Sequence, residues 1–358
     1  MQAYANIKES PTSKSTLQKG DLWLRVGDLA ESCRAGKWDS FIMNSLVLAD
    51  EIDIRSVDGL RIGNAQNTEA KTGVTVLVFD KKARVGIDVS GGGPAAIETH
   101  LADPTTADTP VNAIMLAGGS AYGLAAASGI MQYFEERGIG YDTRFALVPL
   151  VCGSCIYDLC NGSASVRPDS KMGYAACLDA EKNEPKSGNY GAGCGASVGK
   201  ICGMERASNS GLGMYAAKLG DLEMAAVVVV NALGDVYDPA TGTELAGLRS
   251  PDGKHFVDSR TELYKICKKT DMFAGNTTIG AIVTNGAFTK AEMSKIASMT
   301  RNAYARCINP VGTMADGDTI YAATIGNVNA DINVAGTLAA DVMEKAILDA
   351  IRSAGEEL

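Results

Sequence analysis

The 358-residue chain contains only two histidines, His100 and His255. A mechanism that relies on a histidine base therefore has few candidates, which favours chemistry in which another group takes the proton. Both histidines lie in polar stretches, where we expect them at the surface. Aromatic residues are also scarce, at 6% of the chain, so we expect no platform for stacking nucleic-acid bases.

The chain also lacks an excess of positive charge and long apolar runs. Its net charge is −9 and its pI is about 4.9, whereas binding to a nucleic-acid backbone needs clustered lysine and arginine. No apolar run reaches the roughly 18 residues of a membrane span. Residues 1–10 lack the apolar core of a signal peptide. We therefore expect a cytoplasmic protein without nucleic-acid or membrane partners.

Cysteines are present in an odd number, nine, and are scattered along the chain. This pattern favours reduced thiols over a disulfide framework. Cys152 and Cys155 form a C-x-x-C pair with Cys160 nearby, but no second pair or histidine cluster supplies the four ligands of a zinc site. We expect buried free thiols, no metal ion and no cofactor.

The organisation of the chain changes near residue 50. Residues 1–20 are polar and rich in serine, threonine and lysine, and no usable motif follows before residue 57. We predict that residues 1–50 form an N-terminal extension, partly mobile, and that residues 51–358 form a single domain.

Apolar strands and helices alternate through the predicted domain. Residues 72–79 and 83–89 are typical of a β-hairpin with its turn at 80–82. Further strands are predicted at 111–116, 227–231, from 277 on, and at 319–324. Helices are predicted at 122–137, 289–307 and 335–353. This composition favours helices that cover stacked sheets.

One junction in this pattern suggests chemistry. Asn276 ends a polar segment, and Thr277 opens an apolar, β-branched run, so a hydroxyl lies where a loop meets a buried strand. The Thr277 hydroxyl could attack the Asn276 carbonyl and cut the chain into fragments 1–276 and 277–358. The freed Thr277 amine would then be its own base, because a terminal amine has a pKa of about 7.7–8.0.

Other interpretations of these residues remain open. Asn276-Thr277 could be an ordinary strand start, or part of a glycosylation sequon. Asp316 and Asp318 could form a solvated Asp-Gly-Asp turn, and Asn231 could bond to its own backbone at a strand end.

Besides the Asn276-Thr277 junction, a glycine pair offers a candidate binding site for an anion. Gly118 and Gly119 follow a strand and precede a helix, so their N–H groups could bind an anion or an oxyanion. The spacing of a dinucleotide fingerprint is absent.

The segment 274–285, together with 316–319, resembles a family of N-terminal-nucleophile hydrolases, the L-aminopeptidase/D-esterases and β-aminopeptidases. The match is closest to the endo-type 6-aminohexanoate-oligomer hydrolases, the nylon hydrolases, in which the chain is cut within Gly-Asn-Thr-Thr. The resemblance starts near residue 59 and includes further segments: 72–76, 116–124, 156–158, 191–193, 199–200 and 226–231.

The resemblance implies a role for six side chains. Thr277 would be the nucleophile, and Asp316 and Asp318 would orient its ammonium and shuttle its proton. Asn231 would donate to the oxyanion. Tyr157 would donate its phenolic hydrogen to a substrate oxygen, and Lys200 would hold a carboxylate or the neighbours of the nucleophile.

The resemblance also implies an architecture, an assembly and a substrate. The fold would be a four-layer αββα sandwich of two stacked sheets, self-cleaved into α and β fragments. The assembly would be a homo-oligomer, a tetramer of αβ units. The substrate would be a small peptide or an amide oligomer, which a self-processing amide hydrolase cuts.

Three alternatives stay open. The first is an exo-acting aminopeptidase on β-, D- or L-amino-acid amides. The second is an ornithine-type N-acetyltransferase, although its usual Ala-Thr-Met-Leu junction is absent here. The third is an unprocessed binding or scaffold protein on the same fold.

Overall fold

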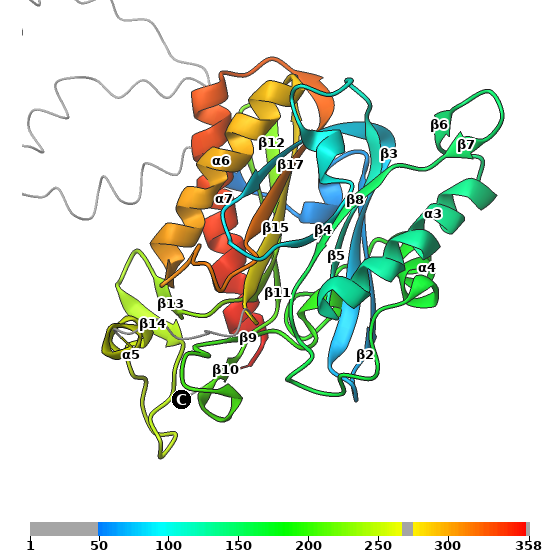
Figure 1. Ribbon diagram of the computed structural model, residues 1–358. Helices are drawn as coiled ribbons and strands as arrows, with labels where there is room; N and C mark the ends of the chain where they lie inside the picture. Colours follow the sequence, from blue (N-terminus) through cyan, green and yellow to red (C-terminus); the bar gives the residue numbers. More distant parts are fainter. Residues whose placement is uncertain (1–48, 267–274, 356–358) are drawn as a thin grey trace, which may run out of the picture. The chain divides into compact units, whose positions relative to one another are not determined.

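The computed structural model describes residues 49–266 and 275–355 (Figure 1). Residues 49–358 belong to one compact unit. The predicted N-terminal extension lies outside the described residues except for its last two, so the boundary at residue 50 stays a prediction. In the described ranges, no helix is long and apolar enough to cross a bilayer.

The long strand β3, Thr72–Val89, joins two sheets. Its first half pairs with β2 (Leu60–Asn67) and β5 (Val111–Ala117), and its second half pairs with β17 (Thr319–Val328). The predicted hairpin over 72–89 is therefore wrong. At the expected turn, the register shifts and Lys82 adopts a φ of 33°, so the strand bends instead of reversing.

The first sheet carries the predicted catalytic strand near its middle. Its strand order is β1-β11-β12-β15-β17-β3, in which β15 and β17 run parallel and all other neighbours run antiparallel. The bounds of its strands not yet given are β1 Asp50–Glu51, β11 Leu212–Leu219, β12 Leu222–Asn231 and β15 Thr277–Gly286.

The second sheet has the order β2-β3-β5-β8-β4, with β8 at Val151–Cys155 and β4 at Ala95–Ile97. Short strands lie outside the two sheets: β6 Tyr141–Asp142, β7 Leu147–Val148, β9 Ser197–Val198, β10 Ser208–Asn209, β13 Asp235–Asp238, β14 Thr243–Ala246 and β16 Ile308–Asn309. The short helix α5 spans Ser259–Lys265.

Helices cover the outer face of each sheet (Figure 1). The helices α6 (Lys290–Cys307) and α7 (Ile332–Ser353) pack on the first sheet, and α3 (Ala126–Glu136) and α4 (Ser170–Ala180) pack on the second. Three hydrophobic cores separate these layers. The four-layer αββα sandwich is thus confirmed.

The side chains of β15 alternate between two of these cores. Ile279 and Ala281 point into the core between the sheets, whereas Ile282 points toward α6 and α7. Because side chains alternate along a strand, Thr277 faces the space between the sheets and Thr278 faces the helices. These two neighbouring threonines therefore lie in different environments.

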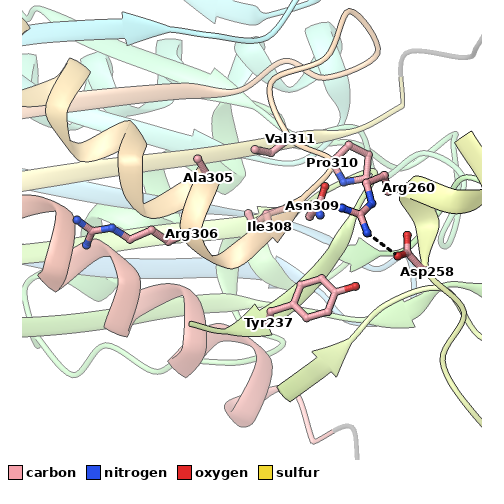
Figure 2. Close-up of a pocket in the computed structure, with 9 residues that line it drawn as sticks. All are labelled: Tyr237, Asp258, Arg260, Ala305, Arg306, Ile308, Asn309, Pro310 and Val311. Atoms are coloured by element: carbon pink, nitrogen blue, oxygen red, sulfur yellow. Dashed lines mark hydrogen bonds and ion pairs between the residues drawn. The ribbon is translucent and has the colours of Figure 1, made fainter. Parts of the chain in front are cut away.

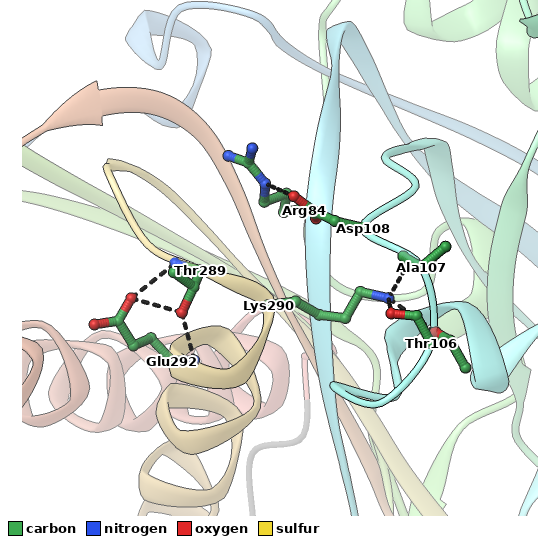
Figure 3. A network of polar contacts seen from close by, with 7 residues as sticks. All are labelled: Arg84, Thr106, Ala107, Asp108, Thr289, Lys290 and Glu292. Atoms are coloured by element: carbon green, nitrogen blue, oxygen red, sulfur yellow. Dashed lines mark hydrogen bonds and ion pairs between the residues drawn. The ribbon is translucent and has the colours of Figure 1, made fainter.

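A buried lysine ties the start of α6 to the second sheet's side of the molecule (Figure 3). Lys290 is only 6% exposed, and its Nζ donates to Thr106 Oγ at 2.9 Å and to the carbonyls of Thr106 and Ala107 at 3.3 and 2.6 Å. Thr289 caps the same helix and forms a capping box with Glu292. The ammonium thus satisfies three acceptors of one loop.

Replacing Lys290 by methionine should destabilise the fold by about 1.5–3 kcal/mol, because the stem is kept while the hydrogen bonds of a charged donor to the loop are lost. Chemical denaturation measures this change. The matched control is Lys81→Met, since Lys81 makes only an exposed ion pair with Asp58 at 3.5 Å. Equal stabilities of the two variants would contradict the role of Lys290.

Candidate active site

The predicted nucleophile and oxyanion donor lie directly opposite each other. Asn231 ends β12 and Thr277 begins β15, and the antiparallel register pairs the two residues. Alternation also directs both side chains to the space between the sheets. Asn231 is 0% exposed and Thr277 is 5% exposed, so any reaction here takes place largely out of water.

The carbonyl of Asn276 is held by two donors. Its oxygen accepts the N–H of Gly317 at 2.9 Å, and the Thr277 hydroxyl donates to the same oxygen. Asn276 also forms a parallel bridge with Asp316. A donor at this oxygen stabilises the negative charge that develops when a nucleophile attacks the carbonyl carbon.

Gly317 was missed in the sequence, where it served only as the spacer of Asp-Gly-Asp. A Cβ at this position would lie 2.8 Å from Thr277 Oγ and 2.8 Å from the Gly93 carbonyl oxygen. The residue must therefore be small to let the loop approach the nucleophile. The available signal was the glycine itself between two acids.

Ser90 and the glycine run at 91–93 support the same loop. The N–H groups of Ser90 and Gly91 donate to the Asp318 carbonyl at 3.0 and 3.2 Å, and that of Gly93 donates to the Asp316 carbonyl at 2.9 Å. No role for these residues was predicted from the sequence. Their role is backbone contact with the acidic loop, which leaves no side-chain signature.

The two acids are buried, so the solvated-turn interpretation is wrong. Asp316 is 1% exposed and Asp318 is 0% exposed. Asp318 accepts the N–H groups of Thr278 and Gly312 at 2.6 and 3.0 Å, and Asp316 accepts the N–H and hydroxyl of Thr313 at 2.8 and 2.6 Å. Burial raises the pKa of both carboxyls, and the Asp316 charge helps to bring the pKa of Asp318 to about 7.

Lys200 joins the site from the glycine-rich loop. Its Nζ donates to the Asn231 carbonyl and to Asn231 Oδ1, both at 2.9 Å, and to the Gly275 carbonyl at 3.2 Å. Burial lowers the pKa of Lys200 to about 7, against the opposing pull of nearby acidic groups. The ammonium thus holds the chain next to Thr277.

The Asn231 side chain connects three segments. Its Oδ1 also accepts the N–H of Ser197 at 3.1 Å, and its Nδ2 donates to the Tyr157 carbonyl at 3.1 Å. These partners lie on other segments, which corrects the alternative of a bond to its own backbone. Tyr157 is half-buried, and burial raises the pKa of its phenol.

Gly118 and Gly119 do not present free donors. The N–H of Gly118 donates to the Gly73 carbonyl at 2.9 Å, and that of Gly119 donates to Asp158 Oδ1 at 2.7 Å. Asp158, which the sequence did not single out, is 3% exposed and also accepts the Thr72 hydroxyl at 2.6 Å. The predicted anion site is thus filled by the protein's own carboxylate, and the glycine pair plays no part in the mechanism below.

Cys152, Cys155 and both histidines take the positions expected, whereas Cys160 is exposed. Cys152 and Cys155 are buried free thiols in β8, and burial raises the pKa of Cys152 to about 12. His100 and His255 are exposed. Within residues 49–266 and 275–355, no group of three or more metal-binding side chains is found.

A large open cavity lies away from these residues (Figure 2). It has a volume of about 650 Å³, and the Asp258–Arg260 ion pair, 3.2 Å long, lies at its side. Its lining consists of Tyr237, Asp258, Arg260, Ala305, Arg306, Ile308, Asn309, Pro310 and Val311. None of the predicted site residues is among them, so size alone does not locate the reactive centre.

Comparison with known proteins shows the family of the chain. The profile of Peptidase family S58 matches residues 53–357. An uncharacterized aminopeptidase of Mycobacterium leprae is 33% identical, over 86% of this chain and 92% of the relative. A 6-aminohexanoate-oligomer endohydrolase of Kocuria sp. is 33% identical, over 82% of this chain and 84% of the relative.

Two solved structures share the fold. The L-aminopeptidase D-Ala-esterase/amidase of Ochrobactrum anthropi, described as a variant of the Ntn hydrolase fold, has a TM-score of 0.64 at 16% identity, with 84% of this chain and 86% of that chain covered. A β-aminopeptidase of Burkholderia sp. has a TM-score of 0.59 at 17% identity, with the same coverage.

The buried ammonium makes a prediction about pH. Between the folded pKa of Lys200 near 7 and its usual value of 10.5, the unfolded chain binds more protons than the folded chain at this residue. Stability from this group therefore rises with pH in that window, by at most about 1.4 kcal/mol per pH unit. The Lys200→Met variant should lack this rise when unfolding is measured from pH 7 to 10, and parallel profiles would contradict it.

Proposed function

Because the chain belongs to peptidase family S58, we propose that it is a self-processing amide hydrolase with the freed Thr277 as its nucleophile. The family and the Ntn hydrolase fold make it a hydrolase of amide bonds. The geometry of the Asn276–Thr277 bond carries the proposal: a hydroxyl and a backbone N–H meet at the same carbonyl oxygen, that of Asn276.

In the first step, the chain cuts itself. Thr277 Oγ attacks the Asn276 carbonyl carbon, and the charge on the oxygen is stabilised by the Gly317 N–H. Collapse of the tetrahedral intermediate breaks the C–N bond, which leaves an ester on Oγ and an amine on Thr277. Water then releases Asn276 as a carboxylate. Lys200 fixes the Gly275 carbonyl, one residue ahead of the cut.

In each later turnover, the Thr277 amine takes the proton of Oγ as Oγ attacks a substrate amide. Asn231 and Tyr157 stabilise the oxyanion, and the ammonium protonates the leaving amine. Asp318 accepts the N–H of Thr278, next to this amine, and Asp316 lies beside the cut in the parallel bridge. These contacts support a role for both carboxyls in orienting the ammonium. Water finally releases the acid.

The substrate class is drawn from relatives and chemistry together. We propose an amide oligomer of the 6-aminohexanoate type or a short peptide, cut by the same acyl-enzyme route. The second candidate is an exo-acting aminopeptidase, which the names of the mycobacterial relatives favour. Cuts inside an oligomer would support the first candidate, and release of N-terminal residues would support the second. A tetramer of αβ units remains part of the proposal.

Intact-mass analysis tests the cut. The purified wild type should yield fragments 1–276 and 277–358 at neutral pH, whereas Thr277→Ala should stay one chain of 37.3 kDa and remain folded. Thr277→Ser keeps a hydroxyl and should cut more slowly. Thr241→Ala, at an exposed threonine, is the control and should cut normally. A wild type that stays whole supports the unprocessed-scaffold alternative instead.

A second variant tests the backbone around the cut. Gly317→Ala should slow self-cleavage by about tenfold or more, because its methyl group displaces the N–H that stabilises the oxyanion. The rate is followed by gel densitometry after expression in the cold. Cleavage at the wild-type rate in this variant would remove Gly317 from the mechanism.

The rate of amide hydrolysis should rise about tenfold per pH unit below the pKa of the Thr277 amine, since only the neutral amine is a base. The measurement is hydrolysis by the cut enzyme from pH 5 to 9. A flat profile over that range would rule out the amine as the base.

A further inference from the structure

The face of β15 away from the nucleophile carries a second polar cluster. The Thr278 side chain lies on this face, and a Cβ at Gly280 would point to it as well, toward α6. Tyr304 of α6 is 1% exposed and lies against Gly280, where a Cβ would come within 2.8 Å of its hydroxyl oxygen. Asp318 falls on the same face by its alternation with Ile320, and its Oδ1 accepts the Thr278 N–H at 2.6 Å.

Two hydroxyls in this cluster have unmet hydrogen bonds. Thr278 Oγ and Tyr304 OH are fully buried, and neither has a hydrogen-bond partner among the described residues. An unsatisfied buried polar group costs about 1–3 kcal/mol, and such groups are commonly satisfied by an internal water. Two of them on the same face of one strand, next to a carboxyl, indicate a polar site.

A cavity lies beside this site and shares Tyr304 with it. Its volume is about 300 Å³, and it is lined by Ser90, Arg301, Asn302, Tyr304, Ala305, Val311 and Gly312. Two of the lining residues bind Asp318 directly: Gly312 N–H donates to Oδ2 and Ser90 N–H donates to the carbonyl, both at 3.0 Å. The cavity is therefore separated from Asp318 only by residues that contact it, on the helix side, whereas the Thr277 side chain lies on the other face of β15.

We propose that this cavity is a rear entrance for water and protons, in which Thr278 Oγ and Tyr304 OH bind a water molecule that exchanges protons with the Asp318 carboxyl. The inference rests on the proposed function, in which Asp318 handles the proton of the Thr277 amine. The cavity gives protons a route to Asp318 that a substrate between the sheets does not block. The bound water gives one proton to the carboxylate and takes one from water in the cavity, so the exchange is balanced.

The charges around Asp318 suit this exchange. Asp316 and Lys200 face it from their loops, Tyr304 faces it from α6, and the freed Thr277 amine would face it from β15. A second acid, Asp88 of β3, helps to raise the pKa of Tyr304 and pairs with Arg301 at 3.2 Å.

These charges place the exchange in the working pH range. Burial, with the Asp316 charge, raises the pKa of Asp318 to about 7, close to the 7.7–8.0 expected of a terminal amine. Asp318 would thus gain and lose its proton in the same pH range as the Thr277 amine.

Removing one hydroxyl tests the route by kinetics. Tyr304→Phe should fold, because the lost hydroxyl has no partner, yet it should lower the turnover rate about tenfold and move the neutral limb of its pH profile. Thr278→Val is the second variant and should change the turnover rate and the pH profile in the same way. The control is Tyr321→Phe, since this tyrosine is equally buried but bonds to Ser154 at 2.8 Å. It should lose stability and keep the wild-type pH profile.

Wild-type pH profiles in both test variants would overturn the route. A crystal structure of the uncut Thr277→Ala chain decides the water site without any activity. We expect an ordered water within hydrogen-bond reach of Thr278 Oγ and Tyr304 OH, whereas a dry cluster or a direct bond between these hydroxyls would overturn it. A wild type that neither cuts itself nor hydrolyses amides defeats the proposed function alone, since the water site is still decided by the crystal.

Discussion

The site depends on one backbone hydrogen bond, from the N–H of Gly317 to the carbonyl of Asn276 at 2.9 Å. This bond extends the parallel pairing of β15 and β17, whose register starts at Ile279 and Thr319, to the bridge between Asn276 and Asp316. It places the Asn276 carbonyl, which the proposed cut would attack, beside a fixed donor and brings the acidic loop beside Asn276. A fixed donor is effective because it needs no rearrangement when charge develops. The glycines at 91 and 317 make the close approach possible.

Three ionisable groups are buried around this bond, which is costly to the fold. Lys200 and Asp318 both have a pKa near 7, one lowered and one raised by the same loss of water. Groups poised near neutrality transfer protons readily at the pH of a cell. Burial of the site also favours neutral, hydrogen-bonded groups over charged ones. Asn231 and backbone donors therefore organise the site more than ion pairs do.

Much of the site was predictable because its residues lie at strand ends. Asn231 and Thr277 are marked in the sequence by polar groups at the edge of valine- and isoleucine-rich runs, and the antiparallel register then brings them together. The layers were predictable for the same reason, since apolar strands and amphipathic helices must cover one another. The error over 72–89 arose because three polar residues indicate a turn or a bend equally well. Contacts between backbones distant in sequence, such as that of Gly317, carry no such pattern.

The central claim is that Thr277 carries the acyl group. The most direct measurement is to quench the enzyme in acid during turnover of a slowly hydrolysed amide or ester, digest it and map the adduct by mass spectrometry. The account predicts an acylated peptide that begins at Thr277, with the modification on its side-chain oxygen. An adduct on Thr278 or on any other residue, or an uncut Asn276–Thr277 bond in an active enzyme, would contradict it.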